Sequence, residues 1–248
     1  MRLLAARPAE IDRKIFPSTR LTPLPVPTPV PWSELFGRTV KVLGPTKFIG
    51  ATVGMTLFFV VYFHVLNNPQ FPVSTMPLIG LDHAFVFSPL WLIPYASLWF
   101  YVTLPPFFLT DGRELSWYAV ASVGLSAVGL AVFFFWPTTL PASDVDWAQY
   151  PTVRFLKAVD AAGNACPSLH VAWAVFTAFW LDRLLLRFGR GGGWRILNGV
   201  WSGAIVLSTV GTKQHVVLDA IAGVALGGLA AGVHFLVWRR RFATEALA

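Results

Sequence analysis

The chain has 248 residues, of which 55% are hydrophobic and 12% charged, and its formal net charge is +7. Average soluble domains carry about 25% charged residues, so this composition excludes a cytosolic enzyme and a disordered protein. The single cysteine excludes a disulfide scaffold. An all-α, polytopic membrane protein is the class that fits.

Six apolar runs have the length of transmembrane helices. A helix needs about 20 apolar residues to cross roughly 30 Å of hydrocarbon. In chain order the runs are Phe48–Leu66, Pro89–Leu109, Trp117–Trp136, Leu169–Leu186, Trp194–Val210 and Val216–Trp238. The second run contains Pro94, Pro105 and Pro106, which break the pairing of backbone groups. We therefore predict a catalytic bundle of six transmembrane helices over residues 48–238.

The segments outside the bundle are basic. Residues 1–47 form a proline-rich N-terminal segment, with an extended polyproline stretch predicted at Pro23–Pro31, and residues 239–248 form a basic tail. With six spans, sixteen of the 19 Lys and Arg residues fall on one side, which makes both termini cytoplasmic by the positive-inside rule. The charge is thus a topology signal, and no nucleic-acid partner is expected. Only Arg154, Lys157 and Lys213 fall on the outer side.

The first candidate site cluster is Asn164-Ala-Cys-Pro-Ser-Leu-His170, directly before an apolar helix. Ser168 suits the N-cap position, and His170 then lies in the first turn. A helix N-terminus offers free N–H groups and a positive dipole end, which bind phosphate.

The second cluster is Lys213-Gln-His215 followed by Asp219. His215 and Asp219 are four residues apart and share one helix face. A carboxylate there can hold one imidazole nitrogen as N–H and leave the other nitrogen free to attack. Both clusters fall on the predicted outer side.

This set of residues suits phosphoryl transfer through a phosphohistidine. We expect His215 to attack phosphorus, Asp219 to orient His215 and stabilise its imidazolium, and His170 to act as general acid and base. Basic side chains, a hydroxyl and helix N–H groups would hold the phosphate oxygens. The candidates are Ser168, Leu169, Lys213, Arg154 and Lys157. No metal or other cofactor is required by this chemistry.

The two clusters resemble the phosphatidic acid phosphatase type 2 superfamily of membrane lipid phosphatases and phosphotransferases. Its pattern is K-x6-R-P, then P-S-G-H, then S-R-x5-H-x3-D. Pro167-Ser168-Leu169-His170 is similar to the second element and His215-x3-Asp219 to the end of the third. The resemblance covers roughly residues 117–238. It implies the same three roles for His215, Asp219 and His170, and an active site that faces outward.

The chain departs from that pattern at three points. Leu169 stands for the glycine, Thr209 stands for the arginine that follows Ser208, and no K-x6-R-P precedes His170. Two phosphate-binding arginines are therefore missing, and Lys213, with the outer-side Arg154 and Lys157, is a candidate to replace them. The loss of the first element resembles the inositol phosphorylceramide synthase branch, whose members transfer a phospho-headgroup between lipids.

Several functions stay open on the sequence. A lipid phosphatase and a headgroup phosphotransferase differ only in whether water or an alcohol resolves the phosphohistidine. A non-catalytic lipid-binding or transport protein would explain the missing arginines, and Ser202 raises an intramembrane serine protease. Asp82 and His83 lie in an outer loop without a motif, and Cys166 is expected to be structural. Compactness favours a bacterial inner membrane, with the site facing the periplasm.

Overall fold

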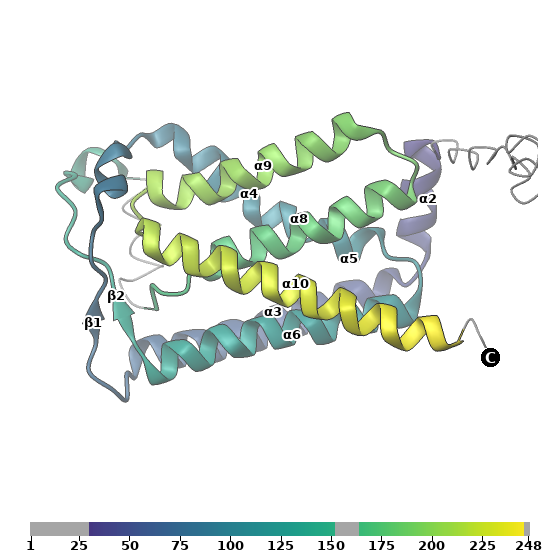
Figure 1. The fold of residues 1–248 in the computed structure, drawn as a ribbon, viewed down its shortest axis with the longest axis horizontal. Coiled ribbons are helices and arrows are strands. Elements are labelled where there is room, and N and C mark those ends of the chain that lie inside the picture. The colour runs from purple at the N-terminus through teal and green to yellow at the C-terminus, as the bar shows by residue number, and fades with distance from the viewer. Residues whose placement is uncertain (1–29, 152–163, 246–248) are drawn as a thin grey trace, which may run out of the picture.

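The computed structural model describes residues 30–151 and 164–245, with side chains described up to residue 240. Its long helices run side by side in an elongated bundle, and only two strands of two residues each occur among the described residues (Figure 1). The α-helices are α2 (Trp32–Lys41), α3 (Gly44–Asn67), α4 (Leu92–Tyr101), α5 (Leu104–Phe108), α6 (Gly112–Phe135), α8 (Leu169–Arg187), α9 (Gly192–Gly211) and α10 (Val217–Glu245). The short elements are β1 (Ser74–Thr75), η2 (Gly80–Ala84), η3 (Pro89–Trp91), β2 (Thr138–Thr139) and η4 (Trp147–Gln149).

Four of the predicted spans are helices long and apolar enough to cross a membrane. They are α3, α6, α8 and residues 217–240 of α10, which indicates an integral membrane protein and confirms the all-α class. The predicted span 89–109 is divided into η3, α4 and α5, because Pro105 and Pro106 start a new helix. The predicted span 194–210 corresponds to α9, which is not one of these four helices. The count of six spans and the orientation of the termini therefore stay predictions.

The N-terminal segment ends in a short helix that the sequence analysis did not predict. Residues 23–29 of the predicted polyproline stretch lie outside the described residues. Helix α2 begins directly after that stretch, at Trp32, and was not predicted. On one side of α2 the side chains of Leu35 and Thr39 are buried, while Phe36 and Val40 are exposed. An amphipathic helix of ten residues gives no long apolar run, so a search for spans does not detect it.

Helix α8 is the centre of the bundle and packs against both α9 and α10. Its aromatic side chains Phe176 and Trp180 are fully buried. Tyr118 of α6 meets the Trp180 ring with 5.3 Å between centroids. The two glycines Gly223 and Gly227 of α10 lie against the backbone of α8, where a Cβ atom would collide with carbonyl oxygens. These glycines let α8 and α10 approach closely.

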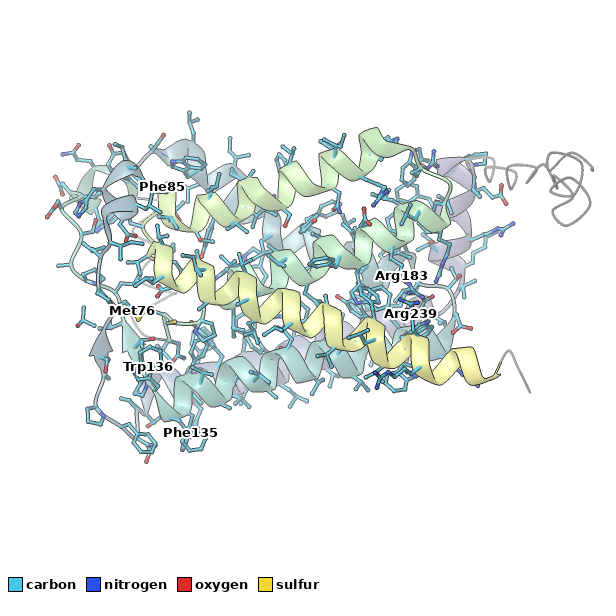
Figure 2. The ribbon with its side chains drawn as sticks, in the orientation of Figure 1. Met76, Phe85, Phe135, Trp136, Arg183 and Arg239 are labelled. Atoms are coloured by element: carbon cyan, nitrogen blue, oxygen red, sulfur yellow. The ribbon has the colours of Figure 1, made fainter. Side chains whose placement is uncertain are left out.

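The two ends of the bundle differ in character. At one end β1 and β2 pair in parallel, so the loop after α3 lies beside the loop after α6 (Figure 1). Helix α2 and the end of α10 lie at the other end (Figure 1). There the buried Glu114 accepts hydrogen bonds of 2.5 and 2.7 Å from Arg187. Arg183 and Arg239 also lie toward this end, and Met76 and Phe85 toward the first (Figure 2).

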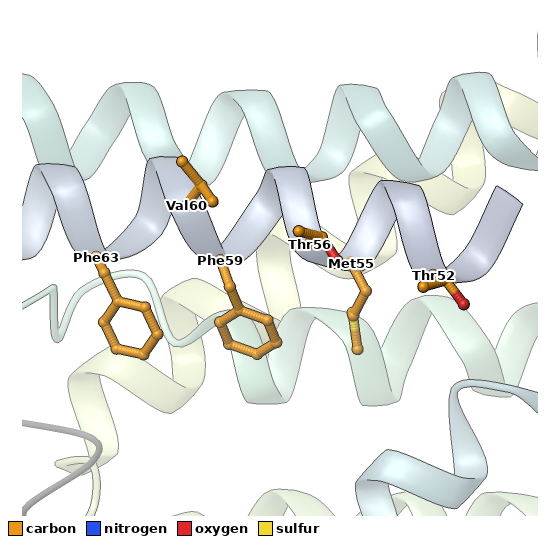
Figure 3. A pocket seen from close by; sticks show the side chains of 6 residues that line it. All are labelled: Thr52, Met55, Thr56, Phe59, Val60 and Phe63. Carbon is orange, nitrogen blue, oxygen red and sulfur yellow. The ribbon is translucent and has the colours of Figure 1, made fainter. Parts of the chain in front are cut away.

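An open apolar groove of about 460 Å³ runs along α3 (Figure 3). Its lining consists of Thr52, Met55, Thr56, Phe59, Val60 and Phe63. No charged side chain lines it, so the candidate chemistry lies elsewhere, at the end of the bundle that holds β1 and β2.

Candidate active site

The first half of the site is the start of α8. Ser168 is its N-cap, as predicted, and its buried hydroxyl accepts a hydrogen bond of 3.2 Å from Val171 N. The backbone N–H of Ser168 donates to the carbonyl oxygen of Asp219, at 3.1 Å. The two predicted clusters are therefore joined directly through their main chains.

The second half is the tight connection between α9 and α10. The carbonyl oxygen of Thr209 accepts hydrogen bonds of 3.0 Å from the backbone N–H groups of both Gln214 and His215. Lys213 adopts a left-handed backbone with φ 58°, which lets the chain reverse between the helices. Trp91 lies against Gly211, where a Cβ atom would be 2.5 Å from its ring. This turn places His215 just before the first residue of α10.

The three residues predicted as catalytic come together. Nδ1 of His215 lies 3.4 Å from Oδ2 of Asp219, and Nε2 of His215 lies 3.4 Å from Nδ1 of His170. His215 is 7% exposed and Asp219 fully buried. The carboxylate also accepts a hydrogen bond of 3.1 Å from Val216 N. One ring nitrogen of His215 thus faces the carboxylate and the other faces His170.

Two aromatic residues of α4 surround His170 and carry no sequence signal of a site. The hydroxyl of the buried Tyr95 lies 3.1 Å from Nε2 of His170. Trp99 approaches the same imidazole edge-on, with 6.3 Å between ring centroids. His170 is therefore held between Tyr95 on one ring nitrogen and His215 on the other. Only a motif that includes the second apolar run could have identified Tyr95.

The predicted phosphate-binding residues have different surroundings. Leu169 packs its side chain against α6, where a Cβ atom on Gly129 would be 2.5 Å away, so only its backbone N–H could serve a phosphate. The ammonium group of Lys213 donates to the carbonyl oxygen of Phe85 at 2.6 Å. Arg154 and Lys157 lie outside the described residues.

Several polar atoms of the site are buried without a hydrogen-bond partner among the described residues. They are Nε2 of Gln214, Nδ1 of His215 and Oδ1 of Asp219. A buried polar group that lacks a partner costs about 1–3 kcal/mol, and such groups concentrate at functional sites. Gln214 was not predicted as a site residue. Thr209, at the position of the family arginine, bonds its own helix through Val206 O.

Cys166, which was expected to be structural, precedes Ser168 by two residues. It is buried, and its backbone N–H donates to the hydroxyl of Thr138 at 2.8 Å. Burial, and then the negative charge of Asp219, raise the pKa of the Cys166 thiol to about 11. The thiol is therefore protonated at neutral pH and a poor nucleophile.

The serine considered for a protease takes part in helix packing. Ser202 is buried in α9, and its hydroxyl donates to the carbonyl oxygen of Ala174 in α8, at 3.3 Å. His234 packs on Trp180, with 5.1 Å between ring centroids, in the second half of α10. Neither residue belongs to the cluster around His215.

Comparison with known proteins agrees with the motifs. The sequence pattern of the PAP2 superfamily matches residues 75–233, which is more than half of the chain. No curated protein and no solved structure matches the chain significantly. The matched region includes both halves of the site as well as Tyr95 and Asp82. The chain therefore belongs to the PAP2 superfamily, whose members are phosphatases and phosphotransferases.

Proposed function

We propose that this protein transfers a phosphoryl group from a lipid phosphate or phosphodiester through a phosphohistidine on His215, at the extracytoplasmic side of the membrane. The observation that carries the proposal is the row Asp219, His215, His170, with 3.4 Å at each step. Burial in a membrane protein makes such ionisable residues functional by default. The family and the apolar helices support a phosphate-bearing lipid as substrate.

In this proposal the two ring nitrogens of His215 have different roles. Nε2 of His215 attacks phosphorus, and the leaving oxygen takes a proton from His170, which later removes a proton from the incoming water or alcohol. Asp219 keeps the proton on Nδ1 of His215 and stabilises the positive charge that forms there. Because Nε2 of His215 and Nδ1 of His170 are 3.4 Å apart, one ring must turn aside to admit the phosphoryl group.

The phosphate oxygens need donors, since the two arginines of the family pattern are absent. The backbone N–H of Leu169 in the first turn of α8 supports this role. Nε2 of Gln214 is buried and has no hydrogen-bond partner in the described part of the chain, which makes it a further donor suited to a phosphate oxygen. The proposed set also includes Ser168, Lys213, Arg154 and Lys157.

The test uses the purified protein in lipid nanodiscs with phosphatidate, a polyprenyl phosphate and an inositol-containing phospholipid, each with and without an added lipid alcohol. Release of inorganic phosphate identifies a phosphatase, and a new phospholipid identifies a phosphotransferase. His215→Asn is expected to abolish turnover and the acid-labile phosphoenzyme. The matched control is His64→Asn, an exposed histidine near the end of α3.

Retained turnover in His215→Asn would refute the phosphohistidine. Binding of the lipid phosphates without any turnover or phosphoenzyme in the wild type would favour a lipid-binding protein on the same fold.

A further inference from the structure

A buried carboxylate outside the motifs contacts the start of α10. Asp82 belongs to η2, in the segment between α3 and α4, and is 4% exposed. Its Oδ2 accepts a hydrogen bond from Ile79 N, and its Oδ1 accepts one from Val217 N, both at 2.8 Å. Val217 is the first residue of α10, so Asp82 satisfies an N–H group that the helix itself leaves unpaired. The carboxylate also lies at the positive end of the helix dipole.

The same segment contacts the chain on the other side of His215. Lys213 donates from Nζ to the carbonyl oxygen of Phe85 at 2.6 Å and lies 3.5 Å from that of Asp82. Lys213 precedes His215 by two residues, and Val217 follows it by two. Residues 82–85 therefore hold the turn that carries His215 at both of its ends.

The hydrogen bonds of two successive amides link Asp82 to the position of Asp219. Val216 N donates to Oδ2 of Asp219 and Val217 N donates to Oδ1 of Asp82, so each amide has its own carboxylate. Without Asp82, the amide of Val217 would lose its carboxylate partner next to Asp219, whose Oδ1 has no hydrogen-bond partner within residues 30–151 and 164–240. An acidic side chain in the first turn of a helix can accept hydrogen bonds from the N–H groups at the helix start. Asp219 would then move away from Nδ1 of His215.

We infer that Asp82 is a positioning residue for the phosphoryl-transfer site, which keeps Asp219 directed at His215 by occupying the amide of Val217. The inference rests on the proposed function of His215. Asp82 touches neither substrate nor the reacting nitrogen in this account and acts through Asp219.

The kinetic test compares Asp82→Ala and Asp82→Asn with the wild type in single-turnover phosphoenzyme formation, with a radiolabelled lipid phosphate. The Asp82→Ala variant is expected to lower the rate constant about 10- to 100-fold, because displacements of about 1 Å at a reacting group cost that much. The Asp82→Asn variant keeps one oxygen for Val217 N and is expected to lie between. Asp111→Asn is the matched control, since Asp111 accepts a hydrogen bond from Glu114 N at the start of α6.

The amplitude of the burst separates positioning from folding. A variant that merely folds less well loses amplitude at an unchanged rate constant, and Asp82→Ala is expected to lose rate constant at nearly unchanged amplitude. A rate constant within twofold of the wild type, or a loss of amplitude alone, would overturn the inference.

Hydrogen exchange gives a readout that needs no activity. Amides of residues 215–219 are expected to exchange at least tenfold faster in Asp82→Ala than in the wild type, with no change in Asp111→Asn. If the wild type forms no phosphoenzyme, the proposed function fails, and faster exchange still supports the hold of Asp82 on the turn. If the exchange rates are unchanged, Asp82 does not hold the turn and the inference fails.

Discussion

Gly223 offers the sharpest test of how helix packing sets the site. A Cβ atom added there would lie 2.5 Å from the carbonyl oxygen of Ser168 and 2.8 Å from Cβ of Val171. Ordinary contacts begin at 3.4 Å, so in Gly223→Ala the start of α8 and α10 must separate by about 0.9 Å. His170 lies in the first turn of α8, and His215 lies just before α10. Separating the two helices therefore separates the two histidines, and we expect kcat to fall by about two orders of magnitude. Overpacking should also cost about 1–3 kcal/mol of stability.

The assay is steady-state turnover of a lipid phosphate in nanodiscs, with thermal unfolding measured on the same samples. Gly228→Ala is the control, because a Cβ atom on Gly228 meets nothing within 4 Å. This control should keep its activity and melt at the same temperature or slightly higher, as alanine favours a helix over glycine by about 1 kcal/mol. Wild-type kcat in Gly223→Ala would refute the reasoning that the α8–α10 contact fixes the distance between the two histidines.

Four further outcomes are expected. Tyr95→Phe should lower kcat about 3- to 10-fold with little change in KM, since it removes one hydrogen bond from His170; an unchanged kcat in the same turnover assay would count against that role. Cys166, with its pKa raised from 9.0 to about 11, should react with iodoacetamide about 100-fold more slowly at pH 8 than an unperturbed thiol, and mass spectrometry of the labelled protein checks this. Because the folded state holds that proton more tightly, its contribution to stability is present below pH 9 and is lost as pH rises toward 11. Glu114→Gln should lower the melting temperature through the loss of about 1–3 kcal/mol, since it leaves Arg187 without its buried partner, while the rate constant of phosphoenzyme formation in the folded fraction stays unchanged.

The long helices could be predicted because an apolar run of about 20 residues has one stable form in a bilayer. The prediction 169–186 differs from α8 by one residue, and 117–136 differs from α6 mainly at its start, where Asp111 caps the helix. The run 89–109 did not form one helix, because its prolines remove backbone donors. Periodicity and hydropathy report on such local constraints and on little else.

The site was only partly predictable for the same reason. His170 lies at the start of one predicted helix, and His215 and Asp219 lie four residues apart at the start of another. These positions were enough to predict that the three residues share one end of the bundle. Tyr95 and Asp82 reach the site from segments that are 75 and 135 residues away from their partners His170 and Val217. Such contacts depend on how α4 and η2 pack against the bundle, and no short motif records them.

The hydrogen bond from the Ser168 amide to the Asp219 carbonyl has a consequence for biosynthesis. The two partners belong to different membrane helices, and Asp219 belongs to α10, which follows all the other described helices in the chain. Because a chain is synthesised from its N-terminus, His170 is made 45 residues before His215. The site therefore cannot assemble until α10 has been inserted beside α8. A chain that ends within α9 would contain His170 but lack His215 and Asp219.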